Sequence, residues 1–180
     1  NRPAFYTGNQ NQLMKDWQLL NFFASNISNL NIKMFSPDFR EFVERLNKSD
    51  VWYMIVGGYA VGFHGHPRYT GDRDIWLLPT QDNANKIVKA IESFGFGSLG
   101  ISQEDLSSEG LIIQLGYPPL RIDLLTSIDG VKFEECYPNR KTTVIDGLLI
   151  NFISYDDLIK NKKASGRHQD LGDIENLEKD

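Results

Sequence analysis

The feature that most constrains the fold is a pair of short apolar runs, Val51–Val56 and Asp74–Leu78, the second headed by an aspartate. Continuous apolar runs of this length are typical of strands that are buried on both faces. Gly57-Gly58 ends the first run and Pro79 ends the second. We therefore expect both runs to be core strands of a sheet.

The segments around these runs predict an α+β fold. Ser36-Pro37-Asp38 combines a capping hydroxyl, a proline and a first-turn acid, which is typical of a helix start. Asp146-Gly147 between two apolar runs is typical of a hairpin turn. The other expected helices are 59–64, 81–94, one opened by Ser154, and 167–178, and the other expected strands are 111–115, 120–126, 142–145 and 148–153. Because strands and helices do not alternate regularly, we expect a short mixed sheet flanked by helices, with further helices at the C-terminus.

The length of 180 residues favours one main domain. We assign it to residues 35–180. Residues 1–34 are rich in Asn and Gln and lack strand-like runs, so we expect a separate helical extension there. The chain does not open with Met, and Met34 precedes a segment that looks complete, which leaves a later start site open.

Charge and cysteine content narrow the class of protein. A net charge of −5 argues against broad attraction to nucleic acid or to an anionic membrane, although residues 160–168 form a local basic cluster. No apolar run approaches the ~18 residues that a membrane span needs. Cys136 is the single cysteine, so an intramolecular disulfide is excluded. We expect a reducing, cytoplasmic setting, and the sequence does not predict the oligomeric state.

Three aspartates carry the main chemical signal. Asp72 and Asp74 are two residues apart at the head of a strand, so both side chains project from one face. Asp123, between apolar neighbours in a later strand, supplies a third carboxylate. Adjacent carboxylates repel unless a positive charge lies between them, and Mg²⁺ prefers carboxylate oxygens. The three residues therefore predict a metal site, with room for two ions of the kind that assist phosphoryl or nucleotidyl transfer.

The glycine pair fits the same chemistry. Gly57-Gly58 at a strand-to-helix junction lets backbone N–H groups approach a phosphate. Arg68 and Lys162 are candidates to neutralise a polyphosphate. A glycine pair or a D-x-D motif alone is a weak signal; the combination with a later strand acid is more specific.

The stretch GGYAVGFHGHPRYTGDRDIWL, followed by the acid in RIDLL, resembles the signature of the DNA polymerase β-like nucleotidyltransferase superfamily. With NKKASGRHQDLGDIENL, it is most similar to a branch of small bacterial proteins related to the AbiEii toxins of abortive-infection systems. The resemblance covers about residues 35–177, and nothing before Met34 matches.

The resemblance implies a Mg²⁺-dependent enzyme that moves a nucleoside monophosphate from a nucleoside triphosphate to a hydroxyl acceptor and releases pyrophosphate. The acceptor could be a tRNA end, a protein side chain or a small molecule, and a toxin role would imply a partner antitoxin. The implied site residues divide by role. Asp72, Asp74 and Asp123 would bind metal, Asp123 would also help to deprotonate the acceptor, Gly57, Gly58 and Lys162 would hold the triphosphate, and Arg167, Asp170 and Asp173 would brace the last helices.

One residue departs from the family pattern. Arg73 stands inside D-x-D, where an apolar residue that faces the core is usual. Its charge predicts either a strand that begins one residue later or an exposed edge. Arg73 also keeps open a rival interpretation, a catalytically silent nucleotide sensor or interaction module of the same fold. A metal-dependent phosphohydrolase is a third alternative, which would release orthophosphate.

Overall fold

The computed structural model describes residues 35–117 and 121–179. The chain divides into two units, Asn1–Ser36 and Pro37–Asp180, and the second carries the helices and strands described below. The helical extension expected over residues 1–34 lies outside the described residues. No helix of the described part of the chain is both long and apolar enough to cross a membrane.

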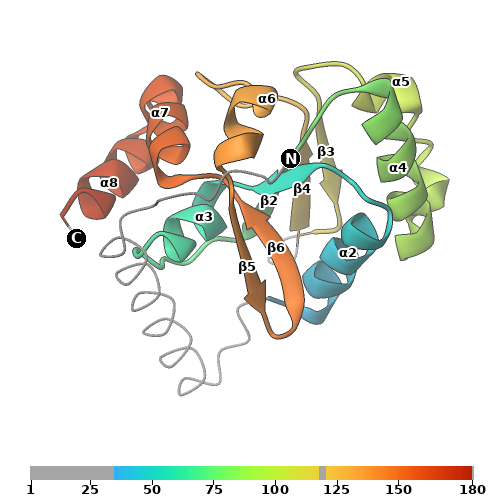
Figure 1. Ribbon diagram of the computed structural model, residues 1–180, viewed down its shortest axis with the longest axis horizontal. Helices are drawn as coiled ribbons and strands as arrows, with labels where there is room; N and C mark the ends of the chain where they lie inside the picture. The colour runs from blue at the N-terminus through green and yellow to red at the C-terminus, as the bar shows by residue number, and fades with distance from the viewer. Residues whose placement is uncertain (1–34, 118–120, 180) are drawn as a thin grey trace, which may run out of the picture. The chain divides into compact units, whose positions relative to one another are not determined.

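A six-stranded mixed sheet forms the centre of the second unit, in the order β3-β4-β2-β1-β6-β5 (Figure 1). The strands are β1 (Tyr53–Ile55), β2 (Asp72–Leu77), β3 (Ile112–Leu115), β4 (Arg121–Leu125), β5 (Lys141–Ile145) and β6 (Leu148–Phe152). The pairs β2–β4 and β1–β6 are parallel, and the other neighbours are antiparallel. The two apolar runs became β1 and β2 at the middle of the sheet, where Tyr53, Ile55, Ile75 and Leu77 are fully buried. The predicted α+β class is confirmed.

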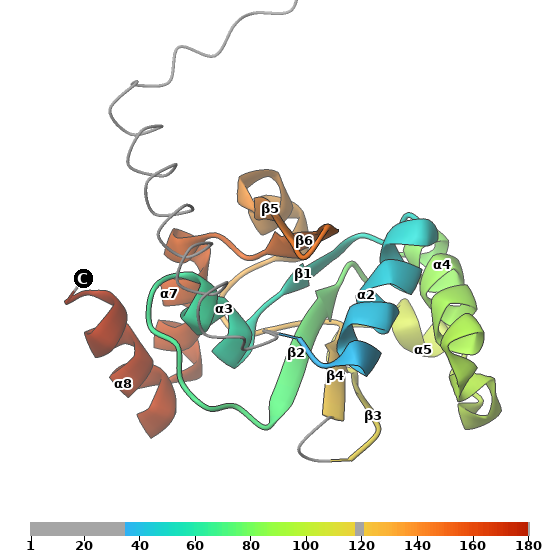
Figure 2. The same cartoon turned by 90° about the horizontal axis from the view of Figure 1, so that it is seen from below.

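Helices lie at both ends of this sheet. They are α2 (Pro37–Lys48), α3 (Gly57–Phe63), α4 (Gln81–Ile91), α5 (Gln103–Leu106), α6 (Phe133–Cys136), α7 (Tyr155–Ser165) and α8 (His168–Leu177). Two views agree that α7 and α8 lie together at one end and that α2 and α4 lie together at the other (Figures 1 and 2). The helices predicted at the C-terminus are therefore confirmed as α7 and α8.

Local signals set several helix boundaries. The hydroxyl oxygens of Thr80 and Ser154 accept hydrogen bonds from the backbone N–H groups of Asn83 and Asp157, which caps α4 and α7. Gly166 adopts a left-handed conformation and ends α7. The helix start predicted at Ser154 is confirmed. The expected helix over residues 59–64 begins two residues earlier than predicted. Helix α3 starts at Gly57, so both glycines belong to the helix.

The expectation for Arg73 was wrong. Strand β2 begins at Asp72, before Arg73, and the Arg73 side chain is buried, with 6% exposure. Its guanidinium lies 5.8 Å from the ring centre of Phe39 and 5.7 Å from that of Tyr59. Alternation along β2 places Arg73 on the face opposite to Asp72 and Asp74. Aromatic rings therefore accommodate the charge on the far side of the sheet through cation–π contacts.

Cys136, in α6, is 2% exposed. Burial, followed by the nearby charge of Asp157, raises the pKa of its thiol to about 12. A thiol with so high a pKa is a poor nucleophile at neutral pH. Cys136 therefore acts as a small apolar core residue.

Candidate active site

The parallel register of β2 and β4 builds the candidate site. Asp72 lies opposite Arg121, and Asp74 lies opposite Asp123. Residues two apart on a strand share a face, so all four side chains project from the same side of the sheet. Three acids and one arginine thus occupy the corners of a four-residue arrangement, which we call the acid–arginine square.

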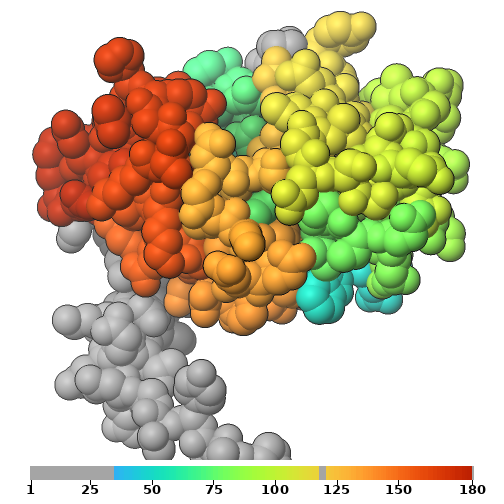
Figure 3. Space-filling view, turned by 90° about the horizontal axis from the view of Figure 1, so that it is seen from above, coloured from blue at the N-terminus to red at the C-terminus, as the bar shows by residue number. Residues whose placement is uncertain are grey.

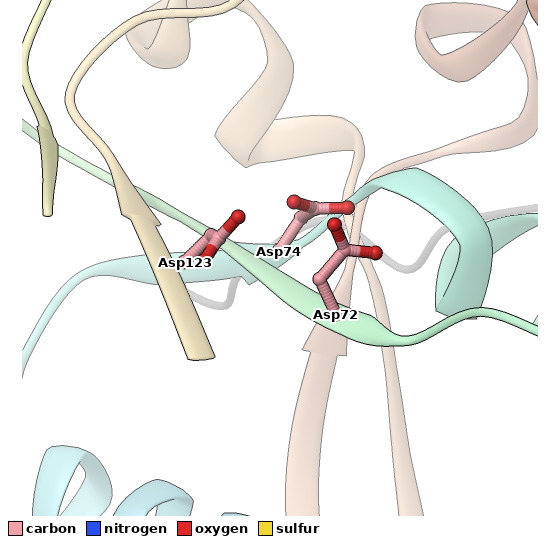
Figure 4. A group of neighbouring side chains, drawn as sticks. All are labelled: Asp72, Asp74 and Asp123. Atoms are coloured by element: carbon pink, nitrogen blue, oxygen red, sulfur yellow. The ribbon is translucent and has the colours of Figure 1, made fainter. Parts of the chain in front are cut away.

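The three carboxylates of the square converge (Figure 4). One oxygen from each of Asp72, Asp74 and Asp123 lies within 4.8 Å of the others. Asp123 is buried, with 6% exposure, and the other two acids are half-buried. Hard carboxylate oxygens at this spacing are the donors that Mg²⁺ or Mn²⁺ takes in proteins. The donor set therefore fits a divalent cation.

Asp74 is the member of the group whose carboxyl pKa is raised. Burial raises the pKa of its carboxyl group to about 6, and the negative charges of Asp72 and Asp123 act in the same direction. The positive charges of Arg167 and Arg121 oppose this shift but do not cancel it. A positive ion beside Asp74 would offset the repulsion from Asp72 and Asp123 and favour the charged carboxylate.

Arg121 is the site residue that the sequence analysis missed. Its Nε donates to Asp123 Oδ1 at 2.6 Å, and its Nη2 donates to Asp123 Oδ2 at 2.8 Å and to Asp72 Oδ2 at 2.9 Å. The available signal was the spacing, because Arg121 is two residues before Asp123 and must share its face. Its contact with Asp72 depends on the register of two strands that are far apart in sequence.

The glycine pair lies directly against the square. Gly57 has φ +61°, and a β carbon at this position would collide with the Asp74 carboxylate. A β carbon at Gly58 would lie 2.9 Å from the side chain of Thr70, whose hydroxyl donates to Asp72 Oδ1 at 3.0 Å. Both glycines are therefore required for α3 to begin beside the acids.

Arg68 and Lys162, which the sequence analysis proposed as phosphate contacts, lie in an ion-pair network with the acids of α8. Lys162 is 3% exposed, and its Nζ donates to Asp170 at 2.8 Å and to Asp173 at 2.7 Å. Arg68 donates to both carboxylate oxygens of Asp173, at 2.7 and 2.9 Å. Burial raises the pKa values of Asp170 and Asp173, but hydrogen bonds from the paired cations outweigh it and hold both below their usual range.

Arg167 differs from the other members of this network. Its Nε donates to Asp170 at 2.6 Å, yet 77% of its side chain is exposed. Its charge also lowers the pKa of Asp74, so its guanidinium lies within electrostatic reach of the square. Arg167 therefore has a side chain that is both exposed and close enough to the square to act on Asp74.

A cavity of about 410 Å³ lies past the ends of β2 and β4, where Pro79 and Thr126 line it, and none of the four residues of the square forms part of its wall. Trp76, two residues after Asp74, forms part of its wall, and its indole N–H has no acceptor among the described residues. The charged residues that line the cavity are Glu109, Lys132, Glu134 and Glu135. The surface around α6, orange in Figure 3, lies between the red surface of α7 and α8 and the yellow-green surface that precedes β3. Three of the four charged residues in the cavity wall are thus acidic.

Comparison with known proteins gives structural neighbours alone. No family model and no curated protein matches the sequence. A proposed nucleotidyltransferase from Thermotoga maritima is 16% identical, with a TM-score of 0.46 over 78% of this chain and 86% of that one. An antigenic nucleotidyltransferase-like protein from Paracoccidioides brasiliensis is also 16% identical, with a TM-score of 0.46 over 77% of this chain and 71% of that one.

Proposed function

We propose that the chain is a metal-dependent nucleotidyltransferase that moves a nucleoside monophosphate from a nucleoside triphosphate to a hydroxyl acceptor. The observation that carries the proposal is the convergence of Asp72, Asp74 and Asp123 within 4.8 Å on two adjacent strands. The absence of side chains at Gly57 and Gly58 lets the start of α3 approach Asp74 and Thr70 closely. Mg²⁺ bound there would neutralise the triphosphate and orient it for in-line displacement.

The residues then have separate tasks. Asp72 and Asp74 would hold the ion or ions, and Asp123 would complete the site and accept the proton of the acceptor hydroxyl. The acceptor oxygen forms a bond to the α-phosphorus, the bond between that phosphorus and the bridging oxygen breaks, and pyrophosphate leaves with the electron pair. Backbone N–H groups at Gly57-Gly58 would donate to the phosphates of the triphosphate.

The cation that contacts the triphosphate is better assigned to Arg167 than to Arg68 or Lys162. A phosphate-binding side chain must reach the ligand, and Arg167 is exposed while Lys162 is 3% exposed. Lys162 and Arg68 instead join Asp170 and Asp173 in holding α7, α8 and the loop before β2 together. This assignment exchanges the roles that the family resemblance implied for Arg167 and Lys162.

The catalytically silent alternative loses its main support. That alternative depended on a charge from Arg73 inside the metal motif, and Arg73 lies on the opposite face of the sheet, near Phe39 and Tyr59. A cognate antitoxin and a toxin role rest on the resemblance to the AbiEii branch alone. They belong to the proposal and need a partner screen of their own.

Charge also bears on the acceptor. The cavity past the ends of β2 and β4 carries three glutamates and one lysine, and the whole chain carries −5. A phosphate backbone would be repelled there. We therefore favour a small molecule or a protein side chain over a tRNA end as the acceptor.

Calorimetric titration of nucleoside triphosphates with and without Mg²⁺ tests the proposal. The native chain should bind in a metal-dependent manner, and the double variant Asp72→Asn/Asp74→Asn should not. Asp82→Asn is the matched control, because Asp82 is 82% exposed and pairs with Lys86 on the surface of α4. Absence of binding by the native chain up to ~1 mM would contradict the proposal. Release of orthophosphate in place of pyrophosphate would support the phosphohydrolase alternative.

A further inference from the structure

The guanidinium of Arg121 uses the same carboxylate oxygens that a metal ion would need. It donates to both oxygens of Asp123 and to one oxygen of Asp72, at 2.6 to 2.9 Å. Its position is fixed by its own strand: Arg121 and Asp123 are two apart on β4, and Arg121 lies directly opposite Asp72 on β2. A planar fork with fixed N–H directions suits this bidentate contact.

The contacts of Arg121 reduce the repulsion between the carboxylates when no metal is bound. Three carboxylates that converge within 4.8 Å repel one another, and Arg121 supplies a positive charge to two of them. A divalent cation supplies the same compensation more strongly and from a position between the same oxygens. The two cations are therefore alternatives for Asp72 and Asp123.

The Arg121 side chain has a route out of the square. Its side chain is 23% exposed, whereas that of Asp123 is 9% exposed. The guanidinium can turn toward solvent without disturbing β4, while the acid stays in place. Once displaced, it remains on the face of the sheet on which a triphosphate would lie.

We propose that Arg121 is a built-in counter-ion that competes with the metal for Asp72 and Asp123 and is displaced when the metal binds. This inference rests on the proposed function, because it takes the three acids as the metal ligands. It makes Arg121 a positioning residue that holds the acids together until the ion arrives. It also lowers the affinity of the site for metal, because metal binding must offset the loss of the three charge-assisted hydrogen bonds that Arg121 donates.

The alternative role predicts the opposite sign. An arginine that stays beside the bound metal would brace Asp123 and strengthen metal binding, so its removal would weaken the affinity. A competing arginine weakens metal binding, so its removal would strengthen the affinity. The direction of the change therefore distinguishes competition from support.

The experiment is titration of the full chain with Mn²⁺ in the absence of nucleotide, followed by the electron paramagnetic resonance signal of free Mn²⁺. Arg121→Gln should bind Mn²⁺ at least about tenfold more tightly than the native chain, because the competing charge is gone. Arg121→Lys keeps a charge without the planar fork and should be intermediate. Arg140→Gln is the control, because its guanidinium lies 3.9 Å from the ring centre of Tyr137 and outside the square.

Thermal unfolding provides a second measurement that does not depend on activity. Without metal, Arg121→Gln should unfold at a lower temperature than the native chain, and saturating Mn²⁺ should raise its midpoint by more. If Arg121→Gln fails to fold, the Arg121→Lys variant still tests the sign. Equal or weaker Mn²⁺ affinity in the variants would overturn the competition and leave the metal site standing. Absence of saturable Mn²⁺ binding in every chain would overturn the proposed function together with this inference.

Discussion

Gly57 lies so close to Asp74 that a β carbon on Gly57 would collide with the Asp74 carboxylate. Gly57 also has φ +61°, a conformation that costs a residue with a side chain about 1–2 kcal/mol. Gly57→Ala should therefore lower the free energy of unfolding by about this amount or more and weaken Mn²⁺ binding as Asp74 is pushed aside. Urea unfolding and Mn²⁺ titration measure the two effects.

Gly71→Ala is the matched control for that variant. Gly71 immediately precedes β2, and a β carbon there would meet no heavy atom within 4 Å. We expect Gly71→Ala to leave both the stability and the Mn²⁺ affinity close to native values. Native metal affinity in Gly57→Ala would argue against close packing of the turn on Asp74.

Lys162 should behave as a structural cation. Replacing it by Met leaves Asp170 and Asp173 buried near each other without their shared ammonium group. Removal of one partner from a buried ion pair typically costs about 3–5 kcal/mol. Lys162→Met should therefore lower the free energy of unfolding by roughly that much, measured by urea denaturation.

The neighbouring residue offers the comparison. Lys163 is 60% exposed and pairs with Glu178 at 3.5 Å, so Lys163→Met should change stability by less than about 1 kcal/mol. A Lys162→Met protein with native stability but reduced triphosphate affinity would restore the phosphate-binding role that the sequence predicted.

The same network predicts how stability depends on acid. The pKa values of Asp170 and Asp173 lie below their usual range because paired cations outweigh the effect of burial. Carboxylates with a depressed folded-state pKa stabilise the fold above the unfolded pKa of about 3.9 and lose that contribution as the pH falls through the folded value. Urea unfolding from pH 7 to pH 3 should show stability falling below about pH 4.

Asp173→Asn should reduce the fall in the free energy of unfolding below about pH 4, since one of the two carboxylates no longer titrates. The variant Asp82→Asn, at an exposed position, should show the same pH dependence of stability as the native chain. An identical slope in the native and Asp173→Asn proteins would mean that other acids carry the pH dependence.

The acids of the site were predictable because their signal is local. Asp72 and Asp74 share a face through their spacing alone, and Asp123 stands out as an acid between apolar residues. The position of Arg121 opposite Asp72 depends on the parallel pairing of β2 with β4, although the helices α4 and α5 and the strand β3 lie between them in the sequence. No short-range pattern encodes that register.

The ion pairs of Lys162 and Arg167 could not be predicted either, because they also depend on tertiary packing. Residues 160–168 give a basic cluster in sequence, in which Lys162 and Arg167 look equivalent. Packing of α7 against α8 buries Lys162 between two aspartates and leaves Arg167 exposed at the junction. The chemistry of each cation is therefore set by tertiary contact, which composition does not reveal.

Arg167 should separate nucleotide binding from folding. We expect Arg167→Gln to weaken metal-dependent triphosphate binding about tenfold, because one charge-assisted contact to phosphate is lost. Its stability should fall by little, because its side chain is 77% exposed. Calorimetric titration and urea unfolding measure these effects, with Lys163→Gln as the control. Native triphosphate affinity in Arg167→Gln would return Arg167 to the bracing role.

The charged residues of the cavity predict that the protein binds RNA weakly. Glu109, Glu134 and Glu135 line the cavity past the ends of β2 and β4, and Lys132 offsets one of these charges. A fluorescent single-stranded RNA at 0.15 M salt should therefore bind more weakly than the ~10⁻⁴ M that marks the weak limit of ordinary nonspecific nucleic-acid binding. Glu109→Lys/Glu134→Lys should tighten RNA binding by reversing the local charge, and this gain should disappear at high salt because it is electrostatic. RNA binding by the native chain that resists salt would instead favour a tRNA acceptor, because contacts other than charge would then have to overcome the repulsion from these glutamates.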